Sequence, residues 1–276
     1  MTTGTTAAFR GASYEIAEAI APTWERRRAD IEEVSAPVRE WMLRELRPRP
    51  GDTVLELAAG VGDTGFEAAA IVGERGRLIS TDFSPSMLQA ARRRGADFRI
   101  IDAERIELED DSVDGVLCRF GYMLMADPAA ALAETRRVLR PGGRAALAVW
   151  GAPERNPFFA IVAISLVQRG HIPSPEPPPA PGVFSMASAE RTTALLEGAG
   201  FSEVRTEEVD VRFVLPTVDE YLSAIADTAG PIALALRRLS GAQRADVRAE
   251  VEDSFTRFEA ADGYELPGVA VCAIAS

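Results

Sequence analysis

The sequence predicts an α/β fold in which a doubly wound, mostly parallel sheet carries helices on both faces. Residues 54–57 are an apolar run that ends in a glycine-rich turn and then enters a helical segment. Apolar runs and helical patterns alternate five times in about 100 residues, which is typical of parallel strands joined by crossover helices. After residue 151 this alternation stops and a proline-dense segment follows.

Each expected element follows from its periodicity and the turn residues that bound it. Apolar runs predict further strands, and helical patterns predict helices between them. The strands are expected at 54–57, 77–81, 98–101, 113–118, 145–150, 204–215 and 268–274. The helices are expected at 66–72, 84–94, 128–139, 156–169, 187–199, 217–225, 231–239 and 242–258. Residues 13–46 are helical in pattern, and we expect Pro22 and Pro37 to interrupt them because proline lacks a backbone N–H.

Composition limits the classes of function. The chain has 276 residues, and its 30 basic and 42 acidic side chains give a net charge of −12, which disfavours nucleic acid as a partner. No apolar run approaches about 20 residues, so no membrane span is expected. The N-terminus shows no apolar signal core, and Cys118 and Cys272 are too few for a disulfide framework. We expect a cytoplasmic protein that acts on small molecules; a homodimer is one option for its assembly.

The turn after the first strand has the features of a ligand-binding loop. Gly60 and Gly62 let the backbone adopt unusual dihedrals and approach a ligand without a Cβ in the way. With Gly65 they satisfy the G-x-G-x-x-G pattern, which dinucleotide sites also show. Glu56 lies just before this loop, and its carboxylate suits a ligand with a positive charge and would repel a pyrophosphate.

The next three strands end in residues that belong to the same site, because ligands of open parallel sheets bind beyond the carboxyl ends of the strands. Asp82 ends the second strand, about 20 residues after the glycines, where a carboxylate can accept the hydroxyls of a ribose. Asp102 and Ala103 follow the third strand, where an acceptor can bind an exocyclic amine. Arg119 and Phe120 follow the fourth strand, beside the reacting end of a ligand.

These stretches together resemble the class I S-adenosylmethionine-dependent methyltransferases, and are similar to the branch that includes the ubiquinone/menaquinone-biosynthesis C-methyltransferases. The matching stretches are VLELAAGVGDTG, TDFSPSML, DAERIEL with DSVDGVLCRFG, and ETRRVLRPGGRAALAVW. They cover roughly residues 52–151. The resemblance implies a Rossmann-like sheet of seven strands in the order 3-2-1-4-5-7-6, with the last strand antiparallel.

The resemblance also implies S-adenosylmethionine as the cofactor, S-adenosylhomocysteine as the product, and no metal. The first strand and its loop would hold the methionine and ribose, through Glu56, Ala58, Gly60, Val61 and Gly62.

The remaining implied contacts come from the next three strand ends. Asp82 would bind the ribose hydroxyls, and Phe83 and Met87 would pack near the adenine. Asp102 and Ala103 would read the adenine edge, and Arg119–Phe120 would lie near the sulfonium.

Two positions depart from the family pattern. Ala58 replaces the first glycine, which is a mild change if its φ is negative, and Val61 replaces a residue that is often polar. The fourth strand lacks the Asn/Asp-Pro-Pro-aromatic motif, which by the resemblance disfavours methylation of adenine, cytosine or glutamine amino groups.

The resemblance implies SN2 methyl transfer to a small-molecule acceptor. His171, the one histidine, opens the proline-dense loop and is the candidate general base. Two alternatives stay open: an NAD(P)-dependent oxidoreductase, from the shared glycine pattern and Asp82, and a non-catalytic S-adenosylmethionine-binding module, from the departures at Ala58 and Val61.

The elements divide the chain into four expected parts. Residues 1–50 form an N-terminal helical cap, and residues 51–151 form the S-adenosylmethionine-binding core. Residues 152–240 supply lid segments over the acceptor pocket together with the sixth strand, and residues 241–276 complete the core with a helix and the last strand. The cap and the lid segments both lie outside the alternating core, which is why we expect them to cover the acceptor.

Overall fold

The computed structural model describes residues 3–92, 98–175 and 180–276. Its strands are β1 (Thr53–Glu56), β2 (Arg77–Asp82), β3 (Phe98–Ile100), β4 (Val113–Arg119), β5 (Leu139–Trp150), β6 (Arg205–Leu215), β7 (Glu259–Ala260) and β8 (Gly263–Ala275). Its α-helices are α1 (Thr3–Arg26), α2 (Arg28–Leu46), α3 (Asp63–Val72), α4 (Pro85–Arg92), α5 (Pro128–Val138), α6 (Pro157–Gln168), α7 (Ala189–Gly198), α8 (Val218–Thr228), α9 (Pro231–Arg238) and α10 (Gly241–Phe255).

The strands form one sheet in the order β3-β2-β1-β4-β5-β8-β6, with β7 paired to β8. Strands β3, β2, β1, β4 and β5 run parallel to one another, and β8 is antiparallel to both β5 and β6. Since β8 is the seventh strand that the sequence predicts, the predicted order 3-2-1-4-5-7-6 and the antiparallel last strand are confirmed. The two-residue strand β7 is an addition that no periodicity indicated.

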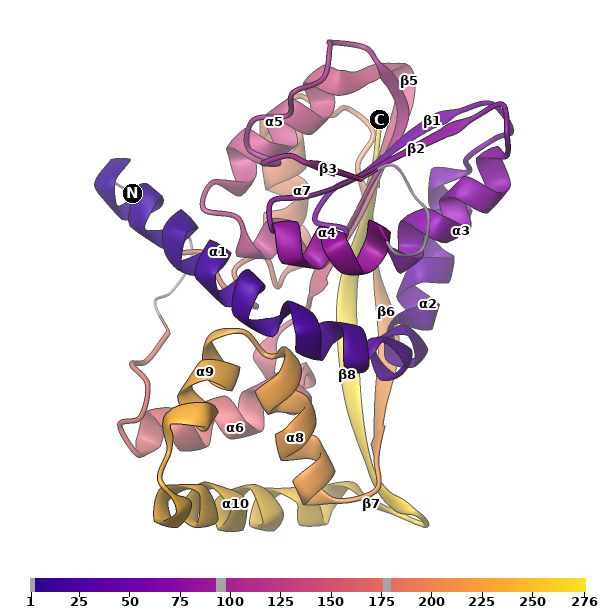
Figure 1. Ribbon diagram of the computed structural model, residues 1–276. Helices are drawn as coiled ribbons and strands as arrows, with labels where there is room; N and C mark the ends of the chain where they lie inside the picture. Colours follow the sequence, from indigo (N-terminus) through magenta and orange to yellow (C-terminus); the bar gives the residue numbers. More distant parts are fainter. Residues whose placement is uncertain (1–2, 93–97, 176–179) are drawn as a thin grey trace.

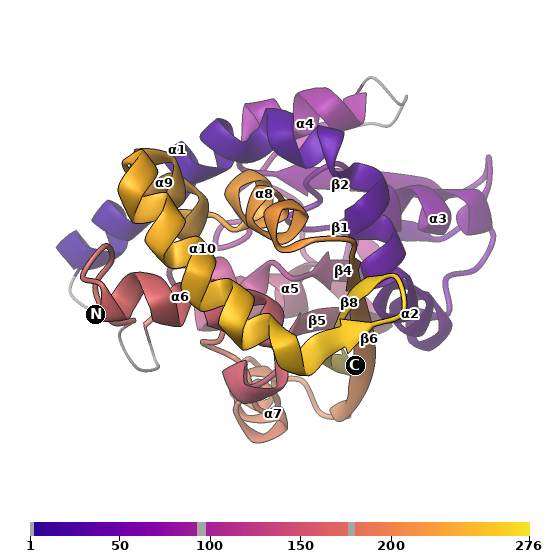
Figure 2. The same cartoon turned by 90° about the horizontal axis from the view of Figure 1, so that it is seen from below.

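Helices cover the sheet on both faces, as predicted (Figure 1). Helix α3 packs on β1 and β2, and α2 packs on β4, β5, β6 and β8. Helices α5 and α7 contact each other and the β5–β8–β6 half of the sheet on the other side. Helices α6, α8, α9 and α10 gather beyond the end of β6, where Figure 2 shows α10 running beneath α8 and α9.

The two interruptions predicted in the N-terminal helices are wrong. Pro22 lies inside α1 and Pro37 inside α2, and the chain breaks between them at Arg27. A proline inside a helix costs about 3 kcal/mol. However, α2 buries side chains such as Val38 and Trp41 almost completely, and each such burial stabilises by about 1.5–3 kcal/mol. Packing of the apolar face therefore outweighs the proline.

Strand β5 begins earlier than the sequence predicts. Leu139 already pairs with Val113, and the register then shifts before Arg144 pairs with Gly115. The segment 140–143, which lies between the predicted helix 128–139 and the predicted strand 145–150, is an irregularity inside β5, where Gly142 supplies a φ of +81°. The predicted end of the helix near residue 94 and part of the proline-dense loop lie outside the described residues.

The sheet reverses its winding between β1 and β4, which are neighbours in space but not in sequence. In open α/β sheets this switch point is where ligands bind, beyond the carboxyl ends of the strands. Glu56, at the end of β1, is in register with Ser80 of β2 and Leu117 of β4. The predicted site residues of the first four strands therefore share one edge of the sheet.

Candidate cofactor site

Glu56 is buried beneath the glycine loop, with 4% of its surface exposed. Its carboxylate accepts hydrogen bonds from the Gly65 backbone N–H at 2.7 Å and from the Ser80 hydroxyl at 2.6 Å. Burial raises its pKa to about 7, although these two hydrogen bonds and the Arg119 charge act in the opposite direction. A Cβ on Gly65 would lie 2.2 Å from Glu56 Oε2, so glycine is required there for the carboxylate to reach the helix.

The glycine loop contains an unexpected strained residue. Ala58 has a φ of +49°, in the left-handed region, so the condition under which alanine would be a mild replacement fails. The left-handed conformation costs an L-residue about 1–2 kcal/mol. Gly60 and Gly62 adopt φ values of +55° and +85° without this cost. Val61 is buried beside them.

Asp82 joins the end of β2 to the glycine loop. One carboxylate oxygen accepts the Gly60 N–H and the other accepts the Ser84 N–H, both at 2.9 Å. The side chain is almost fully buried, and burial raises the pKa of this carboxyl above its usual value. Each oxygen has a further lone pair, so the group can accept additional donors such as hydroxyls.

The end of α3 that faces the loop fits a polar ligand. A Cβ on Gly60 would meet nothing within 4 Å, so open space lies above that residue. The Thr64 hydroxyl, on a side chain only 2% exposed, has no hydrogen-bond partner within the described residues. Buried hydroxyls normally have a partner. An open approach to the backbone and an unsatisfied hydroxyl, beside two carboxylates, are the features expected of a cofactor site.

At the end of β3, Asp102 is half-exposed and its Oδ1 accepts the Glu104 N–H at 2.9 Å. Arg10 of α1 forms ion pairs with Asp102 at 3.1 Å and with Glu104 at 2.6 Å. Glu104 also accepts the Ala126 N–H at 2.9 Å. Ala103 lies between them and packs against the core.

At the end of β4, Arg119 points toward α2 and binds Glu32 and the Ser35 hydroxyl. Glu32 therefore neutralises the charge of Arg119 at the position where the resemblance places the sulfonium of S-adenosylmethionine. Phe120 follows with a φ of +59°, a second strained residue at the same edge. Its ring stacks on Trp150, at the end of β5, with 4.1 Å between the ring centres.

The last three predicted site residues, Phe83, Met87 and His171, lie in different surroundings. Phe83 is partly exposed and its ring contacts Tyr14 of α1, with centres 6.0 Å apart. Met87 is buried under α1, in a cluster with Ile20. His171 follows α6, where its N–H donates to the Leu166 carbonyl at 2.9 Å. Of the predicted set, His171 alone lies off the edge formed by the first four strands.

Helix α1, which belongs to the N-terminal cap that the sequence predicts, lies across this edge (Figure 1). Its Glu18 carboxylate accepts the hydroxyls of Ser84 and Ser86, each at 2.6 Å, and the Ser86 N–H at 3.1 Å. The Trp24 indole N–H donates to the Thr228 carbonyl at 3.1 Å, which joins α1 to α8.

Further along, Arg27 binds Glu220 and Asp227 of α8. Arg28 holds Asp63, the first residue of α3, at 2.8 Å. The N-terminal helices thus connect three parts of the chain: the strand ends, the start of α3, and α8.

Sequence reasoning missed Glu18, Ser80 and Thr64. Ser80 belongs to no sequence motif. It can donate to the Glu56 carboxylate only because the two residues are in register on neighbouring strands. Glu18 is one of several acidic residues in α1, and its importance comes from where α1 packs. No local pattern identifies such a residue.

Residues 54–143 match the model of a methyltransferase domain. The chain is 37% identical over 130 residues to a demethylmenaquinone methyltransferase of Beutenbergia cavernae, a match covering 46% of this chain and 53% of that protein. It is 39% identical over 112 residues to a ubiquinone/menaquinone biosynthesis C-methyltransferase of Burkholderia cenocepacia, covering 38% of this chain and 46% of that protein. The chain thus spans about half the length of these curated relatives.

The fold is also similar to a solved structure, the YcgJ protein of Bacillus subtilis. The TM-score is 0.57 at 20% identity, with 86% of this chain and 96% of that chain covered. The strand order, the glycine loop with its two buried carboxylates, and these matches agree. Over residues 54–143 the chain is therefore similar to class I methyltransferase domains, including those of the quinone-biosynthesis C-methyltransferases.

Proposed function

We propose that this protein is an S-adenosylmethionine-dependent methyltransferase that acts on a small-molecule acceptor. The observation that carries the proposal is the position of Glu56 and Asp82 on two sides of the glycine loop, at the switch point of the sheet. A buried carboxylate beside Gly65 favours a ligand with a cationic centre and disfavours a pyrophosphate. No observation favours an oxidoreductase or a non-catalytic module over this reading.

The residues present fit S-adenosylmethionine. The open space above Gly60 would admit its methionine portion, and Asp82 would accept its ribose hydroxyls. Asp102 and Ala103 would hold its adenine edge, with Phe83 and Met87 nearby. When bound, it supplies a methyl group that its sulfonium already activates.

The chain then has to orient the acceptor and exclude water, since alignment and desolvation supply most of the rate in such a transfer. Helix α1 lies over the strand ends and is held to α8 through Trp24 and Arg27. We propose that α1, α2 and parts of residues 152–240 form the cover of the reaction site. For a hydroxyl acceptor, we propose His171 as the general base, which predicts that His171→Asn slows methyl transfer to phenols and leaves the binding of S-adenosylhomocysteine unchanged.

The acceptor that the site suits best is apolar and planar. Phe120 and Trp150 stack where β4 and β5 end, and Phe159 of α6 packs on Trp150 with ring centres 4.9 Å apart. Aromatic faces pack well against flat apolar molecules. The names of the relatives, which act in demethylmenaquinone and ubiquinone methylation, agree with this class.

The test is methyl transfer from labelled S-adenosylmethionine to a panel of reduced quinones, phenols, amines and carboxylates. We expect acceptor-dependent formation of S-adenosylhomocysteine, strongest with apolar aromatic acceptors. Tight cofactor binding with no transfer to any acceptor would support the non-catalytic module and reject the proposal.

A further inference from the structure

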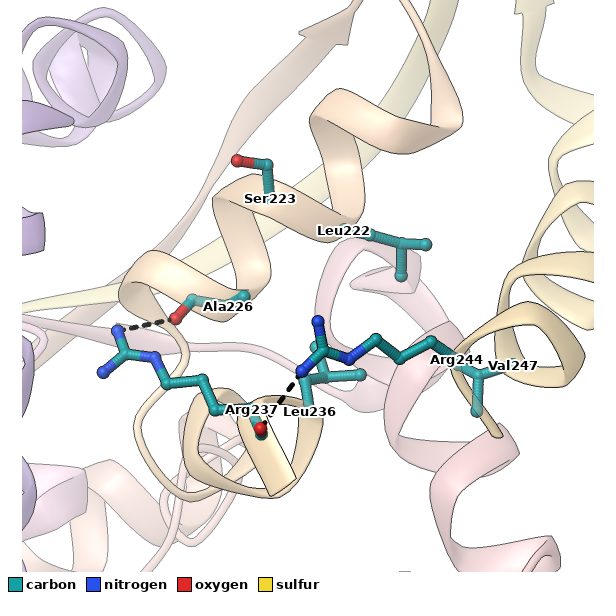
Figure 3. A pocket seen from close by; sticks show the side chains of 7 residues that line it. All are labelled: Leu222, Ser223, Ala226, Leu236, Arg237, Arg244 and Val247. Atoms are coloured by element: carbon teal, nitrogen blue, oxygen red, sulfur yellow. Dashed lines mark hydrogen bonds between the residues drawn. The ribbon is translucent and has the colours of Figure 1, made fainter. Parts of the chain in front are cut away.

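A second pocket lies in the helical region beyond β6, between α8, α9 and α10 (Figure 3). Its volume is about 260 Å³. Its lining residues are Leu222, Ser223, Ala226, Leu236, Arg237, Arg244 and Val247. None of them belongs to the strand ends or the glycine loop. Most of the lining is aliphatic, and Leu236 and Val247 form a buried floor.

Two arginines border this apolar floor. Arg244 extends from α10 toward Leu236 and donates to the Arg237 carbonyl at 3.1 Å (Figure 3). Arg237 donates to the Ala226 carbonyl at 2.9 Å, at the junction of α8 and α9. Within the described ranges, neither guanidinium has a carboxylate partner.

Two other arginines near the pocket do have carboxylate partners. Arg248, one turn further along α10, pairs with Asp219 at 2.7 Å and with Glu252 at 2.6 Å. Arg27, between α1 and α2, donates to Ser223 at the pocket rim and pairs with Glu220 and Asp227. In a chain with a net charge of −12, two guanidiniums satisfied only by backbone carbonyls leave a local positive potential beside an apolar cavity.

We propose that this pocket binds an anionic amphiphile: a short alkyl chain with a carboxylate or phosphate head. The chain would lie on Leu222, Leu236 and Val247, and the head would accept hydrogen bonds from Arg244, with Arg237 adding positive charge at the far rim. Guanidinium is the side chain best suited to both head groups, because its planar fork matches their oxygens. The volume lies just below the range of about 300–1,000 Å³ for small-molecule sites, which favours one short chain.

The pocket also touches the cover of the cofactor site. Ser223 accepts a hydrogen bond from Arg27 at 2.7 Å, and Arg27 holds α1 to α8. The proposed ligand site is separate from the cofactor site, so its occupancy does not depend on the proposed methyl transfer.

Calorimetric titration of the full chain with octanoate, octyl phosphate and octanol tests the proposal, each with and without S-adenosylhomocysteine. We expect at least one of the anions to bind about tenfold or more tightly than octanol, since a charge-assisted hydrogen bond contributes that much. The stronger of the two anions identifies the head group. Equal affinity for octanol and for both anions would overturn the proposal.

Three variants locate the binding. Arg244→Gln should weaken the anion about tenfold and leave octanol unchanged. Arg248→Gln, which removes a paired arginine of the same helix, should change neither. Ala226→Leu fills the pocket and should abolish binding while the circular dichroism spectrum stays that of the wild type. Equal effects of Arg244→Gln and Arg248→Gln, or full binding by a folded Ala226→Leu variant, would contradict the assignment.

Discussion

Two buried carboxylates, Glu56 and Asp82, accept hydrogen bonds from the backbone of the glycine loop at Gly65 and Gly60. The loop is therefore held at both ends by side chains from neighbouring strands. Because burial disfavours the charged form of a carboxyl, both groups have raised pKa values. A cationic ligand would stabilise their charged forms, so the two carboxylates favour a cofactor that carries a positive charge.

Glu56 should make stability depend on pH. Its pKa rises from 4.5 in the unfolded chain to about 7 in the folded protein because it is buried. Its stabilising contribution is complete below about pH 4.5 and is lost as the pH rises through about 7, a change of about 3 kcal/mol. Urea unfolding at pH 4.5 and pH 8 should show the wild type losing stability relative to Glu56→Gln, which cannot ionise. A difference between the two proteins that stays constant with pH would show that Glu56 is not buried in this way.

Ala58 should carry measurable strain. Its φ of +49° is one that glycine adopts at no cost. Relief of about 1–2 kcal/mol of strain exceeds the entropy that glycine adds to the unfolded chain, about 0.4–1 kcal/mol. We therefore expect Ala58→Gly to raise the free energy of unfolding by about 0.5–1 kcal/mol, measured by urea denaturation.

The neighbouring residue is the control for this strain. Ala59 has no positive φ, so Ala59→Gly should lower stability. A loss of stability in both variants would mean that position 58 is unstrained.

Some features of these residues follow from the sequence and others do not. Glu56, before the glycines, and Asp82, the last residue of β2, follow from sequence spacing, and the structure places both at the switch point. The positive φ of Ala58 does not follow, since alanine normally avoids that region and only the path of the loop imposes it. The partners of Arg119 on α2 depend on long-range packing.

At the scale of elements, α1 is the feature that most changes the picture of the site. The sequence predicts a helical cap over the acceptor pocket, but not which residues α1 contacts there. Glu18 joins it to the start of α4, Arg10 to the loop after β3, and Trp24 to α8. These contacts come from distant parts of the sequence, which is why periodicity failed to predict them.

Glu18 should control how firmly α1 is held. Its carboxylate is the common acceptor for Ser84 and Ser86, and these hydrogen bonds lower its pKa, so it is charged at neutral pH. Glu18→Ala should increase hydrogen exchange in residues 3–26 and speed the dissociation of S-adenosylhomocysteine several-fold, since removing a charged hydrogen-bond partner costs about 1.5–3 kcal/mol.

An exposed acidic residue of the same helix provides the control. Glu15→Ala should leave both the exchange and the dissociation rate unchanged. If both variants exchanged like the wild type, α1 would not be held by Glu18 and would not cover the cofactor.

At the scale of the whole molecule, the alternation of strands and helices was enough to predict the doubly wound sheet. The resemblance to a family supplied the strand order, which the pairing of β8 between β5 and β6 confirms. The particular contacts of α1 at the strand ends and the cluster of α8, α9 and α10 were not predictable, because an amphipathic helix specifies a buried face without specifying its partner. The described residues contain no helix long and apolar enough to cross a membrane.

Titration calorimetry of the full chain with S-adenosylhomocysteine and with NADH determines which class of cofactor the glycine loop binds. The position of Glu56 beneath the loop predicts that S-adenosylhomocysteine binds at one site per chain and that NADH, with its pyrophosphate, gives no measurable binding. Tight binding of NADH with none of S-adenosylhomocysteine would contradict the account and identify the glycine loop as a dinucleotide site.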